Sequence, residues 1–297
     1  MCIHRLGDTG KMTEPKNMKN DNGKEMLAEH EIHGLWIGNK LSMMEFLTVH
    51  SFVKHGYVFN LWTYDELEKV PPGCIMRDAN EIIPQERIFS YKHPSQFGVG
   101  KGSVSGFSDI FRYKLLYEQG GCWVDMDVTC IKPFAFTEPY FFRSHHSLAL
   151  VGNILKAPKG SELMKRCYEE ASLTVDENNT DWHKPIDILI RNVSLLGLDK
   201  YIVSNVSNTD EWHKVAPLVK FSMKIPENWY FVHWCNEVWR TNGFSKEHVP
   251  YRSVYGQLLQ SAGLLPSIPL RKRLVHDLNI YWKDFYRPIR SKINRGH

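Results

Sequence analysis

Short apolar runs and amphipathic stretches alternate along the first part of the chain. The run at 32–38 is apolar and ends at a glycine, which predicts a short buried strand. Apolar residues at helical spacing over 42–55, followed by Gly56, predict a helix that ends at a glycine. The apolar run at 57–62 predicts a second strand. Strand, helix and strand in this order indicate a βαβ unit, so we expect a parallel sheet.

The clearest helical pattern lies between residues 105 and 119. Ser105 or Ser108 can cap its start, and the Gly-Gly pair at 120–121 ends it. An apolar strand is predicted to follow over 122–131. The preceding stretch, 71–104, is rich in Pro, Gly, Ser and Lys and is predicted to be an irregular loop.

The second half of the chain continues the mixture of helices and strands. Helices are predicted at 161–173 and 184–196, and the aromatic run at 229–234 predicts a strand. We therefore expect one α/β domain over 31–268. Residues 1–30 are polar and lack the apolar stretch of a signal peptide, so they are predicted to form a disordered N-terminal segment.

The C-terminal residues 269–297 are predicted to form a basic amphipathic helix or tail. They contain eight Lys or Arg and two Asp, a difference of +6, whereas the whole chain has a net charge of +4. The rest therefore carries −2, which gives no indication of nucleic-acid binding. Two interpretations of the tail stay open: a helix that packs one apolar face on the domain, or a contact with an anionic membrane surface.

The cysteines and the hydropathy indicate the compartment. Six cysteines are scattered without a C-x-x-C pair, so neither a zinc site nor a disulfide framework is predicted, and a reducing compartment fits. No stretch approaches the length of a membrane span. We expect a cytoplasmic protein, with peripheral contact to the inner face of the membrane if the tail binds lipid.

The residues that indicate chemistry lie around the predicted strand at 122–131. Asp125 and Asp127 are two residues apart, so they share a face of an extended strand, and their oxygens suit Mg²⁺ or Mn²⁺. A lone D-x-D is more often a solvated strand end or turn than a metal site. Here it follows an apolar strand and a helix whose Asp109 and Arg112 lie at i and i+3, on one face. That pair is either an ordinary ion pair or a contact for sugar hydroxyls and phosphate.

The run S-D-I-F-R-Y-K-L-L-Y-E-Q-G-G-C-W-V-D-M-D, at 108–127, resembles a known family. It is similar to the sugar-binding region of the D-x-D glycosyltransferases, which are like glycosyltransferase family 32. That group includes bacterial capsular and surface-polysaccharide transferases and initiating mannosyltransferases, and the catalytic domains of large glucosylating toxins are related. The runs I-H-G-L-W-I-G at 32–38 and L-W-T at 61–63 resemble the first two strands of the family.

The resemblance implies a fold and an activity. The fold would be α/β of the GT-A type, with a Rossmann-like, mostly parallel central sheet flanked by helices. The activity would be the metal-dependent transfer of a hexose or N-acetylhexosamine from a UDP- or GDP-sugar, with retention of configuration. The acceptor would be a glycan or a lipid-linked saccharide, in surface or capsular polysaccharide synthesis. The cofactor would be Mn²⁺ or Mg²⁺.

Site residues follow from the same resemblance. The catalytic residues would be Asp125, Asp127 and Arg112. The donor would contact seven residues: Leu35, Trp36, Ile37, Asp109, Arg112, Trp123 and Asp125, with Trp36 stacked on the base. Asp127 would ligate the metal directly and Asp125 through water. His233 or Asn236 would supply a further metal contact, although a purely structural role for His233 is left open.

Two other functions fit some of these residues. Asp125-Met-Asp-Val-Thr129 also matches the D-x-D-x-T motif of haloacid-dehalogenase-type phosphatases, in which the first aspartate is the nucleophile. The acidic pair that such enzymes need downstream has no counterpart here, because the one Gly-Asp dipeptide is at 7–8. A catalytically inactive sugar-binding module is the second alternative.

Overall fold

The computed structural model describes residues 18–19, 25–26 and 31–293. The predicted disordered segment 1–30 therefore lies outside the described residues except for β1 (Met18–Lys19) and β2 (Glu25–Met26), which pair antiparallel.

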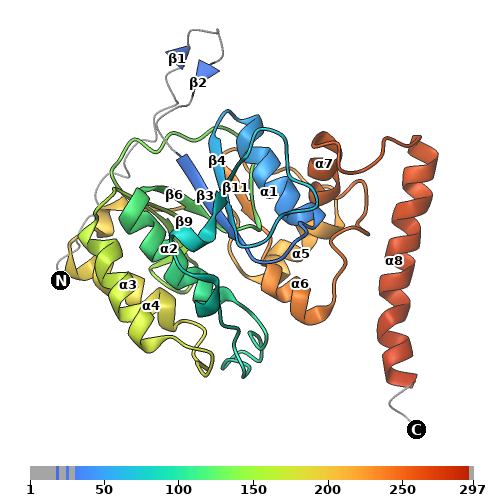
Figure 1. Cartoon of the computed structure of the whole chain (residues 1–297). Helices are drawn as coiled ribbons and strands as arrows, with labels where there is room; N and C mark the ends of the chain where they lie inside the picture. The colour runs from blue at the N-terminus through green and yellow to red at the C-terminus, as the bar shows by residue number, and fades with distance from the viewer. Residues whose placement is uncertain (1–17, 20–24, 27–30, 294–297) are drawn as a thin grey trace, which may run out of the picture.

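A seven-stranded sheet forms the centre of the molecule (Figure 1). Its strands are, in spatial order, β10 (Ile202–Val203), β8 (Phe141–Ser144), β9 (Leu150–Ala157), β6 (Gly121–Val124), β3 (Glu31–Trp36), β4 (Val58–Thr63) and β5 (Ile75–Asp78). Strand β9 is antiparallel to both of its neighbours, and the other four pairs in this sheet are parallel. The predicted α/β fold with a mostly parallel central sheet flanked by helices is confirmed.

Helices cover both faces of this sheet (Figure 1). The helices of residues 31–293 are α1 (Met43–Lys54), α2 (Ser105–Gln119), α3 (Glu162–Thr174), α4 (Lys184–Leu195), α5 (Trp212–Lys220), α6 (Asn236–Asn242), α7 (Val254–Ser261) and α8 (Leu270–Ile293), of which α8 stands apart from the sheet (Figure 1). Side chains alternate along each strand. On β3, Leu35 packs into the core beneath α2, α3 and α4, whereas Ile32 packs into the core beneath α1. Both faces of the sheet are therefore buried.

Two predictions about the local structure were wrong. The loop predicted at 71–104 contains β5 and the 3₁₀ turns η1 (Ala79–Glu81) and η2 (Gln85–Arg87). All four residues of β5 are exposed, so this edge strand lacks the apolar pattern that reveals a buried one. The predicted strand at 122–131 is split into β6 and β7 (Val128–Cys130). Because Val128 N–H donates to Asp125 O, the chain turns between them.

This turn redirects the chain to a second, smaller sheet. Strand β7 pairs antiparallel with β11 (Phe231–His233), the aromatic strand predicted from the sequence, and Val128 lies opposite His233. Two segments more than a hundred residues apart in the sequence thus meet directly after Asp127.

The glycine pair after α2 is required by its surroundings. Gly120 and Gly121 both have positive φ, and a Cβ on Gly120 would lie 2.5 Å from Lys159 N. The pair therefore ends the helix and starts β6 at a close backbone approach.

Helix α8 lies within the predicted C-terminal segment 269–297 and is attached to the rest of the chain through a buried carboxylate. Asp277 is fully buried and accepts hydrogen bonds from Tyr251 N at 2.7 Å and Arg252 N at 3.2 Å. The apolar side chains of Leu270, Val275 and Leu278 are exposed. Across the described part of the chain, no helix is long and apolar enough to cross a membrane.

Candidate active site

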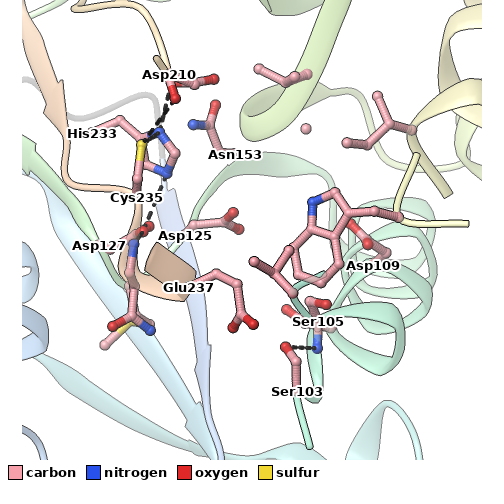
Figure 2. Close-up of a pocket in the computed structure, with 18 of the residues that line it drawn as sticks. Ser103, Ser105, Asp109, Asp125, Asp127, Asn153, Asp210, His233, Cys235 and Glu237 are labelled. Carbon is pink, nitrogen blue, oxygen red and sulfur yellow. Dashed lines mark hydrogen bonds and ion pairs between the residues drawn. The ribbon is translucent and has the colours of Figure 1, made fainter. Parts of the chain in front are cut away.

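A cavity of about 700 Å³ lies where α2 begins, β6 ends and α6 begins. All the site residues predicted from the sequence line it: Leu35, Trp36, Ile37, Asp109, Arg112, Trp123, Asp125, Asp127, His233 and Asn236. Figure 2 shows the carboxylates of Asp109, Asp125 and Asp127 reaching the same space. Asp109 comes from α2, whereas the turn after β6 carries both Asp125 and Asp127.

The guanidinium of Arg112 joins two of these carboxylates. Its Nη2 lies 2.9 Å from Asp109 Oδ1 and 3.1 Å from Asp125 Oδ1. Trp123 Nε1 also donates to Asp125 Oδ1, at 2.7 Å, and its ring lies beneath the guanidinium. A Cβ at Gly152 would come within 2.3 Å of Arg112 Nη1, so a larger residue there would displace the guanidinium. Arg112 is therefore fixed on three sides.

Burial and the neighbouring opposite charges shift the pKa values of Asp109, Arg112 and Asp125 in opposite directions. Burial raises the pKa of Asp109 to about 6, although Arg112 opposes the shift. Burial also raises the pKa of Asp125, against the attraction of Arg112. The pKa of Arg112 is raised in turn, because the two carboxylates outweigh the effect of burial. The guanidinium thus stays charged while Asp109 titrates near pH 6.

We expect Asp109 to make the free energy of unfolding depend on pH. Its pKa is raised from 3.8 to about 6, so the folded chain holds this proton more tightly than the unfolded chain. This contribution is complete below about pH 4 and is lost as the pH rises through 6. At roughly 1.4 kcal/mol per pKa unit, the loss is on the order of 3 kcal/mol. Urea unfolding at several pH values should show this slope in the wild type but not in Asp109→Asn, and equal slopes would contradict it.

On the other side of the cavity, His233 lies between two carboxylates (Figure 2). Its Nε2 lies 3.2 Å from Asp127 Oδ2, and its Nδ1 lies 2.7 Å from Asp210 Oδ1. Burial lowers the pKa of His233, but Asp127, Cys235 and Asp210 together raise it well above its ordinary value. For Asp127, burial is outweighed by His233 and by Asn236 N–H, which hold its pKa below the usual range.

The residues around Asp127 fit a divalent cation. Asn236 N donates to Asp127 Oδ2 at 2.7 Å, and Asn236 Oδ1 is buried without a hydrogen-bond partner. A carboxylate and an imidazole nitrogen 3.2 Å apart, with the side chain of Asn236 lining the same cavity, are ligand types that bind Mn²⁺ or Mg²⁺. His233 and Asn236, which the sequence left as alternatives, both lie beside Asp127.

The loop before α2 forms part of the rim of the cavity. Gly100 N donates to Glu237 Oε1 at 2.9 Å, and Arg240 Nη2 donates to Lys101 O at 2.8 Å. Arg240 also pairs with Glu237 at 2.7 Å. The loop is therefore fastened to α6, directly after Asn236.

Several residues of the site were not predicted. Asp210 follows β10, Asn153 lies in the middle of β9, and Glu237 is in α6, yet all line the cavity. Asn153 gives a signal that could have been used, since it is a lone polar residue in the apolar run Leu150–Leu155. Asp210 gives none, because no spacing connects it with Asp127.

Comparison with known proteins gives one sequence match. Residues 75–144 match the family described as "Glycosyltransferase sugar-binding region containing DXD motif". This segment includes Asp109, Arg112, Trp123, Asp125 and Asp127. A search of curated proteins finds no match.

Solved structures with similar folds include three transferases. A protein described as "PaToxG Glycosyltransferase" has 14% identity and a TM-score of 0.40, over 57% of this chain and 68% of that chain. The apo form of the glycosyltransferase GlyE from Streptococcus pneumoniae TIGR4 has 14% identity and a TM-score of 0.44, over 86% and 64%. A transferase mutant has 9% identity and a TM-score of 0.36, over 64% and 90%.

The phosphatase alternative lacks support from the site. Such an enzyme needs a lysine near its nucleophilic aspartate, and no lysine of the described residues lines the cavity. The family match instead covers α2, β6 and the turn that carries Asp125 and Asp127. Residues 75–144 are thus a sugar-binding region of the D-x-D type, and the chain that carries them is a glycosyltransferase.

Proposed function

We propose that this enzyme is a metal-dependent, retaining glycosyltransferase of the GT-A type. It moves a hexose or N-acetylhexosamine from a UDP- or GDP-sugar to a glycan or lipid-linked saccharide, in the synthesis of a surface polysaccharide such as a capsule. The cofactor is Mn²⁺ or Mg²⁺.

One observation supports a polar ligand in the cavity more than any other. Of the four buried side-chain atoms without a hydrogen-bond partner in the described residues, three belong to residues that line it: Arg112 Nε, Asn153 Nδ2 and Asn236 Oδ1. A buried unpaired polar atom costs about 1–3 kcal/mol, so a site that keeps three is prepared for a ligand. Two donors and one acceptor suit sugar hydroxyls, phosphate oxygens and a cation.

Different residues of the cavity bind different parts of the donor. Leu35, Trp36 and Ile37 form an apolar wall for the base, and Trp36 is already fixed because its Nε1 donates to Lys40 O at 3.0 Å. Asp109 accepts hydrogen bonds from sugar hydroxyls, and Arg112 donates to the sugar or the phosphate.

Asp127, with His233 and Asn236, would hold the cation, and Asp125 would contact it through water. A cation held there would supply positive charge that offsets the negative charge on the leaving diphosphate. Arg112 stabilises the same charge from the opposite side of the cavity. These groups position the acceptor hydroxyl and the leaving group on one face of the sugar, which is compatible with retention without a protein nucleophile.

The proposal is tested by incubating the protein with Mn²⁺ and a panel of UDP- and GDP-sugars. We expect slow, metal-dependent hydrolysis of one donor, followed by mass spectrometry and nucleotide release. Tight binding without hydrolysis or transfer would favour the inactive sugar-binding module. If no donor binds at any Mn²⁺ concentration, the proposed function is wrong.

We also propose that α8 contacts an anionic membrane surface from the cytoplasmic side. The charge of the tail and the exposed Val275 and Leu278 support this. Leu278→Glu should weaken sedimentation with phosphatidylserine vesicles at least about tenfold, because it puts an acidic group among lipid chains. Asn279→Glu, at the next and equally exposed position, is the matched control for added charge. If both variants lose the same amount of vesicle binding, the attraction is electrostatic and Leu278 does not enter the lipid. If the wild type does not bind the vesicles, the proposed membrane contact is wrong.

A further inference from the structure

Behind His233, a buried arginine gathers the polar side chains of several elements. Arg143 lies on β8, at the point where the β8–β9 register shifts, and its side chain is only 3% exposed. Its guanidinium donates to five acceptors: Ser207 Oγ at 2.6 Å, Asn208 O at 2.5 Å, Asn153 Oδ1 at 3.3 Å, and Asp210 Oδ2 at 2.9 Å and Oδ1 at 2.7 Å. A buried charge bound this completely holds its partners in one geometry.

Asp210 is the partner that connects Arg143 to the active site. Both of its oxygens bind the guanidinium, and Oδ1 also lies 2.7 Å from His233 Nδ1. Because both oxygens of Asp210 accept hydrogen bonds from a guanidinium, Asp210 is a carboxylate and can only accept. Nδ1 must therefore be the donor, and Nε2 is the nitrogen that faces Asp127.

The same atoms could be mistaken for a second cation site. Ligand atoms of Asp210, His233 and Cys235 all lie within 4.8 Å of one another. The guanidinium of Arg143, however, already occupies both oxygens of Asp210 and repels a further cation. The arrangement therefore serves His233 instead of a second ion.

We propose that Asp210, held by Arg143, is a positioning residue for the cation site. It fixes the hydrogen of His233 on Nδ1 and the orientation of the ring, so that Nε2 is presented beside Asp127. Asp210 itself touches neither the cation nor the sugar. This inference rests on the proposed metal dependence and names residues that determine the affinity for the cation.

Asp210→Asn is the sharpest test because it changes almost no volume. An amide can turn its NH₂ toward His233 Nδ1, which keeps the imidazole hydrogen on Nε2, so that Nε2 can no longer offer a lone pair to a cation beside Asp127. We expect Mn²⁺ affinity, measured by electron paramagnetic resonance without any sugar donor, to fall about 10–100-fold. The nitrogen coupling of the bound Mn²⁺ should disappear from the spin-echo spectrum.

A double-mutant cycle separates this role from a structural one. Once His233→Ala has removed the ring, adding Asp210→Asn should weaken Mn²⁺ binding no further. Asp187→Asn, on the exposed face of α4, is the control and should bind Mn²⁺ as the wild type does. Arg143→Lys keeps the charge but cannot bridge both oxygens, so it should weaken Mn²⁺ binding less than Asp210→Asn. If Asp210→Asn folds poorly, the Mn²⁺ affinity of Arg143→Lys tests the positioning role instead.

The outcomes distinguish this inference from the proposed function. Wild-type affinity and nitrogen coupling in both Asp210→Asn and Arg143→Lys, or additive losses in the cycle, would overturn the positioning role and leave the metal dependence intact. A wild-type chain that binds no Mn²⁺, with or without nucleotide, would overturn both.

Discussion

Replacing Asp127 with Asn should abolish Mn²⁺-dependent donor binding and lower sugar transfer by at least about a thousandfold. The side chain keeps its shape, so Asn236 N–H can still find an oxygen acceptor. The lost negative charge is the one that a cation needs, and Asp127 is the carboxylate that contacts both His233 and Asn236. Calorimetric titration of Mn²⁺ and of the donor measures the first effect, and initial transfer rates measure the second.

The matched control for this variant is Asp65→Asn, an exposed carboxylate outside the cavity. It should leave both quantities unchanged. If the Asp127→Asn variant retains Mn²⁺ affinity, the cation binds elsewhere and the assignment of Asp127 is wrong. Thermal melting without Mn²⁺ shows whether the variant is folded, since the test concerns binding and not stability.

Replacing Arg112 with Met should have the largest effect on stability. Asp109 and Asp125, which are partly buried, would then lack the cation that they share, and removing one partner of a buried ion pair costs about 3–5 kcal/mol. Sugar transfer should fall at least about a hundredfold, because the donor loses a charged contact and Asp125 loses its orientation. Urea unfolding gives the first value and donor kinetics give the second.

Arg166→Met provides the comparison on the surface. Arg166 also pairs with an acidic residue on its own helix, Glu162, at 2.7 Å, but its side chain is 47% exposed. Its loss should cost less than about 1 kcal/mol. If both arginine variants lose similar stability, the burial of Arg112 is not what makes its ion pairs important. Arg112→Lys should recover part of the stability but little of the transfer, because an ammonium lacks the planar fork that can bind phosphate and stack on Trp123.

Local patterns were sufficient for the half of the site that lies on α2 and β6. Asp109 and Arg112 share a helix face by spacing alone, and the Gly-Gly pair and the apolar strand place Asp125 after them. The parallel sheet followed from one βαβ unit. These inferences succeeded because each depends on residues close together in the sequence.

The other half depends on contacts between distant segments. Asp210 meets His233 because β10 joins the sheet at β8 while β11 pairs with β7, and no sequence period encodes either pairing. The split of the predicted strand at Asp125 was missed for a related reason. The apolar residues after the turn are buried as well, but against β11, so the hydrophobic pattern continues unchanged through the turn.

The fastening of the loop before α2 has a consequence for the order of events in a catalytic cycle. Asn236 and Glu237 are consecutive residues of α6, one beside Asp127 and the other bonded to Gly100. A movement of α6 would therefore also move the rim of the cavity. We expect the nucleotide to leave slowly while the cation stays in place, so that nucleotide release limits the turnover rate. Chelation of the metal should then accelerate the release of nucleotide that is already bound.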